Sequence, residues 1–475
     1  MKGYITVYLA LVTGILLSMF LTVIGASRRD LIRLQIECCT DMAMQSALAQ
    51  YHQEMLSRYG LFFVDTSYGS GEPDYHKTEQ MICSYLEKNL APEQTFAVSG
   101  AGNLTGLSAE SVELLQAGAA TDENFGVLKY HVVQYMKDCY GISAAQGLLA
   151  LGEQLAGSGY TGDGIEQEWD AAQAQLTEEI RSGKRLQDEE WDGNIPETPS
   201  DAVQATRGEG ILSRVVKEKK LSSKAVSAQS LVSGRKRNQG TGLSAKKLVP
   251  DSVWENGLLY AYILEKCGYF GAEKENSALD YQVEYILHGQ ESDVENLRKT
   301  AQQLLWIREA SNAAFLFSSS LKQPAETAAL LITGILGLPE LAELMTTVIL
   351  FAWSYAESVK DVRILLSGGK VPLVKNQESW NTSFGQLLTY RAHLDDWKES
   401  ENGMTYRDYL GGLLFLKGAD KVMPGLADVM ESDIRKTAGN EKFRMDGLID
   451  SMQVMISVSS SYGGNWQITR EYDYE

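Results

Sequence analysis

An uncharged stretch of 23 residues, positions 4–26, lies near the N-terminus of this 475-residue chain. As an α-helix it would be about 34 Å long, enough to cross the roughly 30 Å hydrocarbon core of a bilayer with some tilt. A cleaved secretory signal has a shorter apolar region and a small-residue exit, and cleavage near Ala26 is the alternative. The stretch therefore predicts a transmembrane anchor, with Tyr4 and Tyr8 at the position of interfacial aromatic residues.

The predicted helix continues beyond the membrane, because residues 27–59 contain neither proline nor glycine. Apolar side chains recur there at helical spacing, so we expect one helix of about 55 residues with an amphipathic second half. Its apolar side is a predicted association face that needs the rest of the chain or neighbouring copies as partner: Leu31, Leu34, Cys38, Met42, Leu48, Met55 and Tyr59. Cys38 is expected to be an ordinary core residue, with a cross-link between two helices as the alternative.

The N-terminal segment also resembles a known class of proteins. Residues 2–11, with Gly3 ahead of a long helix, look like the pseudopilin start of TadE/TadG-like proteins of the tight-adherence (Flp) pilus machinery. Most of the chain resembles an uncharacterised family of single-span proteins, a domain of unknown function, from clostridia-like Gram-positive bacteria. That resemblance rests on the Gly3 start, the turn at 59–62, and the segments 279–286 and 352–358.

The pilin resemblance implies that a prepilin peptidase cuts after Gly3, leaving Tyr4 as the first residue. Pilin-type proteins have Glu five residues after that glycine, whereas this chain has Tyr8, which leaves processing and filament incorporation open. The charges flanking the span would place the large domain in the cytoplasm. The family resemblance instead implies an outward-facing domain, so we expect a single-pass protein of the cell membrane with an extracellular domain.

Composition and periodicity predict an α+β, helix-rich fold: the long transmembrane helix continues into a soluble domain that ends in a β-hairpin. The expected parts are an anchor and membrane-proximal helix (1–60), a helix-rich module (61–184), a charged linker or surface loop (185–250) and an α+β module (251–475). The charged part carries eleven basic and two acidic residues between 207 and 247. It is either a solvated loop folded back on the acidic stretch before it, or a patch for an anionic partner.

Several elements are predicted along these parts. Helices are expected at 76–90, 124–140, 143–155 and 164–182, and a further helix at 292–317 follows a capping box at Ser292. Residues 327–355 are expected to form a buried helix pair. The expected strands are 279–287, which is half-buried, 95–102, and the hairpin of 445–459 with 466–474, and residues 108–116 are expected to form another short element. The hairpin turn contains Gly463 and Gly464, as a tight turn requires.

Motifs that carry chemistry are absent from the sequence. It contains no G-x-S-x-G, H-E-x-x-H or Walker-type loop, and its five cysteines form no C-x-x-C pair. His393, Asp395 and Asp396 are close in sequence but do not share a helical face well, so we expect a solvent-facing helix there and no metal. Glu357, on a predicted buried helix, either has a raised pKa or pairs with Lys360 or Arg363. We expect no enzyme and no cofactor.

The charge balance excludes one class of partner. With 62 acidic and 43 basic residues the net charge is −19, which opposes binding to nucleic acid. The expected partners are the lipid bilayer and other membrane or pilus-assembly proteins, or further copies of the chain. The predicted function is that of a non-catalytic structural or assembly component of the cell envelope. An envelope sensor with a ligand-binding domain and an unrecognised wall-active enzyme are the alternatives.

Overall fold

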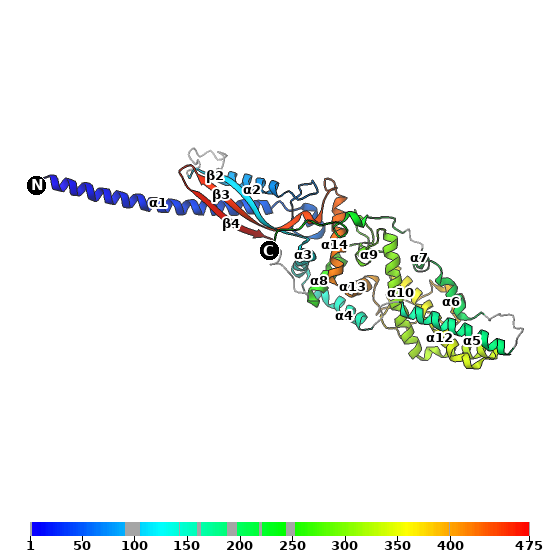
Figure 1. Ribbon diagram of the computed structural model, residues 1–475. Coiled ribbons are helices and arrows are strands. Elements are labelled where there is room, and N and C mark those ends of the chain that lie inside the picture. Colours follow the sequence, from blue (N-terminus) through cyan, green and yellow to red (C-terminus); the bar gives the residue numbers. More distant parts are fainter. Residues whose placement is uncertain are drawn as a thin grey trace. The chain divides into compact units, whose positions relative to one another are not determined.

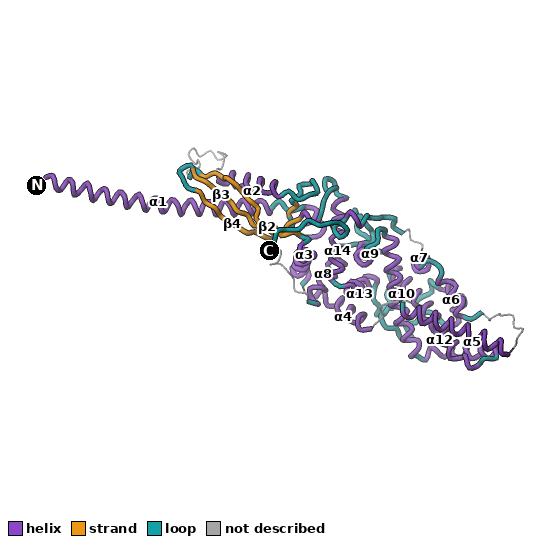
Figure 2. The backbone as a smooth tube through the Cα atoms, viewed as in Figure 1, coloured by secondary structure: helices purple, strands orange, loops and turns teal. Residues whose placement is uncertain are grey.

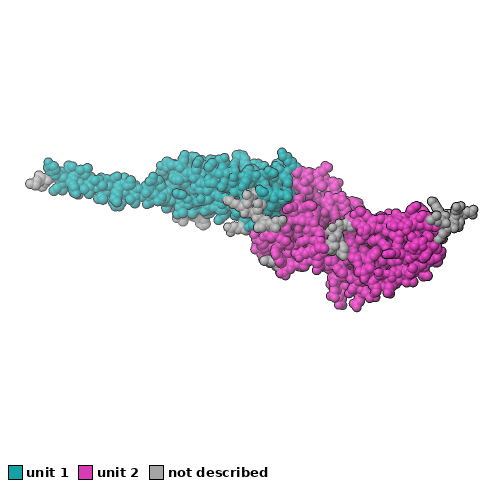
Figure 3. Space-filling model, turned by 60° about the horizontal axis from the view of Figure 1, so that its bottom comes forward, with its two compact units in different colours: residues 1–131, 236–249, 437–475 teal, residues 132–235, 250–436 magenta. Residues whose placement is uncertain are grey.

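The computed structural model describes residues 2–90, 105–141, 143–158, 163–187, 197–217, 221–243, 252–398 and 400–474. The chain forms two compact units, which Figure 3 shows in different colours. Unit 1 comprises residues 1–131, 236–249 and 437–475, and unit 2 comprises residues 132–235 and 250–436. The boundaries of these units differ from those predicted at 60, 184 and 250, because unit 1 combines segments from both ends of the chain.

Unit 1 begins with the helix α1 (Lys2–Leu48), drawn in blue in Figure 1. By length and composition, α1 is the one helix among the described residues that could cross a membrane. The predicted continuation of this helix to Tyr59 is wrong, since a separate π-helical turn covers Met55–Tyr59. The chain reverses between His52 and Phe63, where the backbone N–H of His52 donates to the carbonyl of Phe63 at 2.8 Å. This backbone pairing overrides the helical periodicity.

An antiparallel sheet forms the second part of unit 1 (Figure 2). Its central strand β3 (Leu448–Ser460) pairs with the strands β1 (Val64–Asp65), β2 (Leu107–Ala119) and β4 (Asn465–Asp473). The predicted C-terminal hairpin is confirmed as β3 and β4, with positive φ angles at both turn glycines. The short element at 108–116 belongs to β2, and the strand predicted at 95–102 lies outside the described residues.

The core of unit 1 lies between its helices and this sheet. The second half of α1 and the helix α2 (Tyr75–Leu90) pack with the sheet in one apolar cluster, and α2 confirms the helix predicted at 76–90. Figure 1 shows both helices beside the strands. The cluster includes, from α1, Ile32, Ile36, Ala43 and Met44, and, from β3, Met452, Val454, Ile456 and Val458. The alternation along β3 is that of a strand with one buried face.

Unit 2 is helical among its described residues. It contains the last part of α3 (Asp122–Tyr140), from Val132 on. The helices that follow are α4 (Ser143–Ser158), α5 (Gly164–Gln187), α6 (Pro199–Arg207), α7 (Ile211–Val215), α8 (Val253–Lys266), α9 (Gln282–His288), α10 (Asp293–Ser318), α11 (Gln323–Leu336), α12 (Ala342–Leu366), α13 (Tyr406–Lys417) and α14 (Ala419–Arg435). The predicted helices at 124–140, 143–155, 164–182 and 292–317 are confirmed. The predicted helix pair is present as α11 and α12, but only α12 is buried as expected, because Leu330, Leu331 and Ile335 of α11 are exposed. Ser292 caps α10 by accepting from the N–H of Glu295.

The strand predicted at 279–287 is wrong, because most of the segment is the helix α9. Residues 282–287 are all buried, so the segment has no solvent-facing side. Its polar side chains form hydrogen bonds inside unit 2: the amide of Gln282 donates to Asp433 at 2.7 Å, and Glu284 Oε1 accepts from the hydroxyl of Tyr406 at 2.7 Å. A polar residue at every second position therefore marks buried hydrogen bonds here, and not a half-exposed strand.

The segment predicted as a linker, residues 185–250, is partly folded. It contains α6 and α7, and Val203, Ile211 and Val215 are buried. Two of its basic residues form ion pairs within unit 2: Arg207 pairs at 2.6 Å with Asp170, which belongs to the acidic stretch before the segment, and Arg235 pairs with Glu431 at 2.9 Å. These pairs agree with a segment folded back on the chain.

Candidate functional site

The predicted processing residues lie in the first turns of α1. Tyr4 and Tyr8 are 88 % and 69 % exposed, and a Cβ added to Gly3 would meet no neighbour within 4 Å. All three residues are therefore accessible to a membrane or to a second protein. Their role in processing stays a prediction.

The predicted association face of α1 divides into an exposed and a buried part. Leu31 and Leu34 are each 59 % exposed and Met42 is 46 % exposed, and Cys38 is exposed as well. We call these four residues the exposed stripe. The remaining three residues of the predicted face, Leu48, Met55 and Tyr59, are buried within unit 1. The rest of the chain therefore already covers the last part of the predicted face.

The two adjacent cysteines of α1 take opposite roles. The core position predicted for Cys38 is wrong, because Cys39 is the buried one. Successive residues on a helix point about 100° apart, so only one of the two can face the sheet. The Cys39 thiol lies 3.5 Å from the carbonyl oxygen of Asn89, and burial raises its pKa. Cys38 is left on the stripe.

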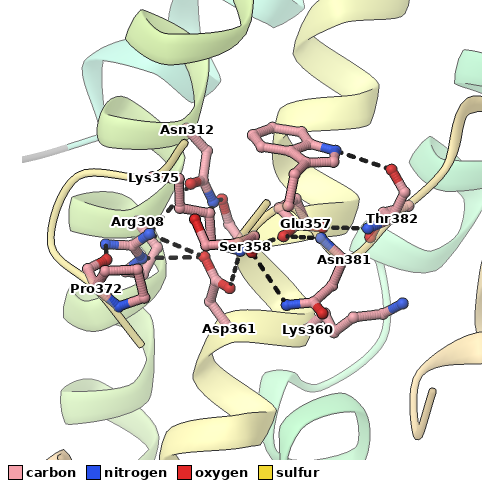
Figure 4. Close-up of polar contacts among 12 residues, drawn as sticks. Arg308, Asn312, Glu357, Ser358, Lys360, Asp361, Pro372, Lys375, Asn381 and Thr382 are labelled. Atoms are coloured by element: carbon pink, nitrogen blue, oxygen red, sulfur yellow. Dashed lines mark hydrogen bonds and ion pairs between the residues drawn. The ribbon is translucent and has the colours of Figure 1, made fainter. Parts of the chain in front are cut away.

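A buried network of charged side chains lies in unit 2 (Figure 4). Arg308 on α10 and Asp361 on α12 are fully buried and pair at 3.1 Å. Lys375, from the loop that follows α12, contacts Asp361 at 2.5 Å and also pairs with the carboxylate of Glu357. Two cations and two anions therefore cancel in a dry environment, as buried charges require.

Hydrogen bonds satisfy much of the rest of this network. The Arg308 guanidinium donates to the carbonyls of Pro372 and Leu373 at 2.9 and 2.7 Å, and Asn312 donates to Asp361 at 2.9 Å. Burial by itself would raise the pKa of Asp361, but the charges of Lys375 and Arg308 hold it below its ordinary value. The network thus ties the loop after α12 to two helices.

Glu357 pairs with a residue that its sequence neighbourhood does not contain. The predicted partners Lys360 and Arg363 are bonded elsewhere: Lys360 donates to the Asp396 carbonyl at 3.0 Å, and Arg363 pairs with Asp395 at 2.9 Å. The expected pairing of Glu357 is therefore corrected to Lys375, 18 residues further on. His393 contacts Asp396 at 2.8 Å, and both aspartates are exposed, as predicted for that segment.

The network also fixes the segment after Trp380. The Glu357 carboxylate accepts the backbone N–H groups of Asn381 and Thr382 at 2.9 and 2.7 Å. The indole N–H groups of Trp353 and Trp380 both donate to the carbonyl of Thr382 at 2.8 Å. Several bonds therefore hold the backbone of residues 381–382 in place.

This segment forms part of a groove of about 790 Å³ in unit 2, which we call the aromatic groove. Its aromatic lining consists of Trp353, Trp380, Phe384 and Trp397, and its polar lining includes Gln323, Gln377, Asn381, Thr382, Ser383, Asp396 and Lys398. Clefts of this size with a few polar groups among aromatic ones are typical of small-ligand sites.

Each charged side chain of the network is paired with an opposite charge, which favours a structural role for it. Among the described residues, no group of three or more His, Cys, Asp or Glu is placed to hold a metal ion.

The sequence matches a family of unknown function, DUF5702, over residues 189–460. The match covers more than half of the chain. The chain belongs to this family. No curated protein and no solved structure matches it. The DUF5702 region contains the charged network and the aromatic groove, whereas α1, α2 and β2 precede it. The match confirms the expected membership in a family of unknown function. The resemblance to pseudopilins stays a prediction.

The sequence alone did not reveal Arg308, Asp361 and Lys375 as one cluster. A signal was present, since Glu357 and Asp361 occur four residues apart in a largely apolar helix of this DUF5702 protein, where each needs a partner when buried. The identity of those partners depends on how α10 and the loop pack against α12. No local pattern encodes that packing.

Proposed function

We propose that this DUF5702 protein is a membrane-anchored, non-catalytic structural or assembly component of the cell envelope. It is similar to a pseudopilin and holds its large domain outside the cell. The observation that carries the proposal is the exposed stripe of α1, which continues beyond the apolar span of the same helix.

The stripe is suited to helix–helix association. Its residues recur at intervals of three and four, so they lie on one side of α1, away from the side that packs in the unit 1 core. Fully burying a Leu or Met side chain contributes about 1.5–3 kcal/mol. Two α1 helices held side by side by their membrane spans would bring their stripes together. The partner is then a second copy of the chain or another membrane protein with an apolar helix.

Cysteine cross-linking in native membranes tests this proposal. Mild oxidation is expected to form a disulfide between the Cys38 thiols of two copies, because a second copy packed on the stripe brings the same thiol next to the first. The C38S variant should lose the linked species. The C139S variant should keep it, since Cys139 is also exposed but lies on α3. The L34R variant should reduce the linked fraction about tenfold or more, because packing would bury its charge without a partner.

Two results of this experiment would contradict association through the stripe. One is a linked species that survives in C38S and disappears in C139S. The other is the absence of any linked species in membranes that contain the protein at its native level.

The intact mass of the protein from its native membrane tests the pilin-like part of the proposal. A mass that begins at Tyr4 supports cleavage after Gly3 by a prepilin peptidase. A mass that begins at Met1 contradicts this processing and reduces the N-terminus to a plain signal anchor.

A further inference from the structure

The aromatic groove is independent of the exposed stripe, and its lining indicates a ligand class. We infer that it binds a neutral oligosaccharide. Two of its aromatic side chains, Trp353 and Trp380, are only 2 % and 8 % exposed and form a packed floor. Their ring centroids lie 6.0 Å apart, and the planes of the two rings make an angle of 87°. Phe384 and Trp397 are half-buried and so keep part of their surface open to a ligand. An aromatic face is electron-rich and attracts the C–H groups of a pyranose ring.

The polar lining matches sugar hydroxyls. Gln323, Gln377 and Asn381 carry side-chain amides that both donate and accept hydrogen bonds, and Ser383 adds a hydroxyl. A sugar hydroxyl likewise donates and accepts, so neutral groups of this kind pair with it without a charge.

Thr382 provides an independent sign of a missing ligand. It lines the groove, is only 1 % exposed, and its Oγ1 has no hydrogen-bond partner in the described part of the chain. Buried hydroxyls are normally bonded, because leaving one unpaired costs about 1–3 kcal/mol. Rotation of this side chain toward the groove would let a ligand hydroxyl provide the partner.

The charges around the groove favour a neutral ligand over a cation. Aromatic groups also bind ammonium ions, but the chain's own lysines already occupy the vicinity of these rings. The ammonium of Lys375 lies 5.7 Å from the ring centroid of Trp380, and that of Lys217 lies 5.9 Å from Trp397. These lysines already occupy positions near the two rings that a cationic ligand would need. Asp396 and Lys398 carry opposite charges in the lining, so a net anionic ligand gains little.

The groove wall is rigid before any ligand arrives. The buried Glu357 carboxylate and the two indole N–H groups hold residues 381–382, as described above. Binding then costs little conformational entropy in this segment, which improves the affinity for a small ligand.

Titration of the full-length protein in lipid nanodiscs tests this inference, with sugar-free detergents used for extraction. The probes are chitotetraose, cellotetraose and maltotetraose, and binding is followed by calorimetry and tryptophan fluorescence. We expect at least one of them to bind saturably with a Kd at or below about 1 mM. The W397A variant should weaken binding about tenfold or more through loss of a stacking surface. The Q377A variant, at an exposed position, should weaken it severalfold.

The W254A variant is the matched control. Trp254 is 50 % exposed but lies on α8, outside the groove lining, so its removal should leave the affinity unchanged. The inference is overturned if none of the three sugars binds saturably up to about 10 mM. It is also overturned if W397A and Q377A both bind like the unaltered protein, or if choline binds in a Trp397-dependent manner while the sugars do not.

Discussion

Replacing Asp361 by alanine is expected to lower the free energy of unfolding of unit 2 by about 3–5 kcal/mol, the usual cost of removing one partner from a buried ion pair. The carboxylate of Asp361 is fully buried between the guanidinium of Arg308 and the ammonium of Lys375. Without it, two cations share the single carboxylate of Glu357. One positive charge then stays in the core without compensation, which a low dielectric makes costly.

Asp395→Ala is the matched control for this prediction. Asp395 also binds an arginine through both oxygens, at 2.9 and 3.1 Å from Arg363, but its side chain is 46 % exposed. Water screens such a pair, so we expect its loss to cost less than about 1 kcal/mol. Each variant thus removes an aspartate that pairs with an arginine, in a buried position for Asp361 and in an exposed one for Asp395.

Urea unfolding followed by tryptophan fluorescence measures both variants. Seven of the eight tryptophans belong to the sequence of unit 2, so the signal reports mainly on that unit. A loss for Asp361→Ala no larger than that for Asp395→Ala would show that the buried network contributes no more than a surface pair.

Replacing Glu309 by glutamine is expected to stabilise unit 2 by about 3 kcal/mol at pH 7. Glu309 on α10 is fully buried, and neither of its carboxyl oxygens has a hydrogen-bond partner among the described residues. Burial raises its pKa to about 8; Glu166 and Asp170 on α5 raise it further, and Arg207 on α6 lowers it. Glutamine keeps the shape of the side chain and removes the titration.

The sign of the pH dependence follows from the two pKa values. The unfolded chain releases this proton near 4.5, whereas the folded chain keeps it to about 8. Between these values the folded state binds more protons, so its stability falls as the pH rises. Glu309→Gln and the unaltered protein should therefore be equally stable near pH 4 and diverge up to about pH 8, above which the difference stays constant.

Unfolding of both proteins at pH values from about 4 to 9 measures this difference. Glu340→Gln, at an exposed position, is the control and should shift nothing. A constant difference between Glu309→Gln and the unaltered protein across this range would contradict a buried, neutral Glu309.

Several local predictions succeeded for a common reason. The helices α2, α10 and α12 and the C-terminal hairpin depend on periodicity, capping and turn glycines that lie within a few residues of one another. The segment 279–287 shows the limit of this reasoning. Its alternation resembles that of a strand, but burial on all sides and hydrogen bonds to distant residues make it the helix α9.

The candidate sites were predicted less completely than the elements. The exposed stripe contains four of the seven residues expected on α1, because helical spacing defines a side of the helix. Spacing cannot say which side the same chain will cover. The sheet that does so pairs Ser108 with Ser459, two residues 351 positions apart.

The sequence by itself determined the apolar helix α1, most of the helices and the terminal hairpin, since these follow from the preferences of neighbouring residues. Only the tertiary structure decided which side of α1 is buried, which cation pairs with Glu357, and which loops line the aromatic groove. Such contacts join residues that are remote in sequence, and they are selected by the burial of apolar surface and the pairing of buried charges across the whole fold.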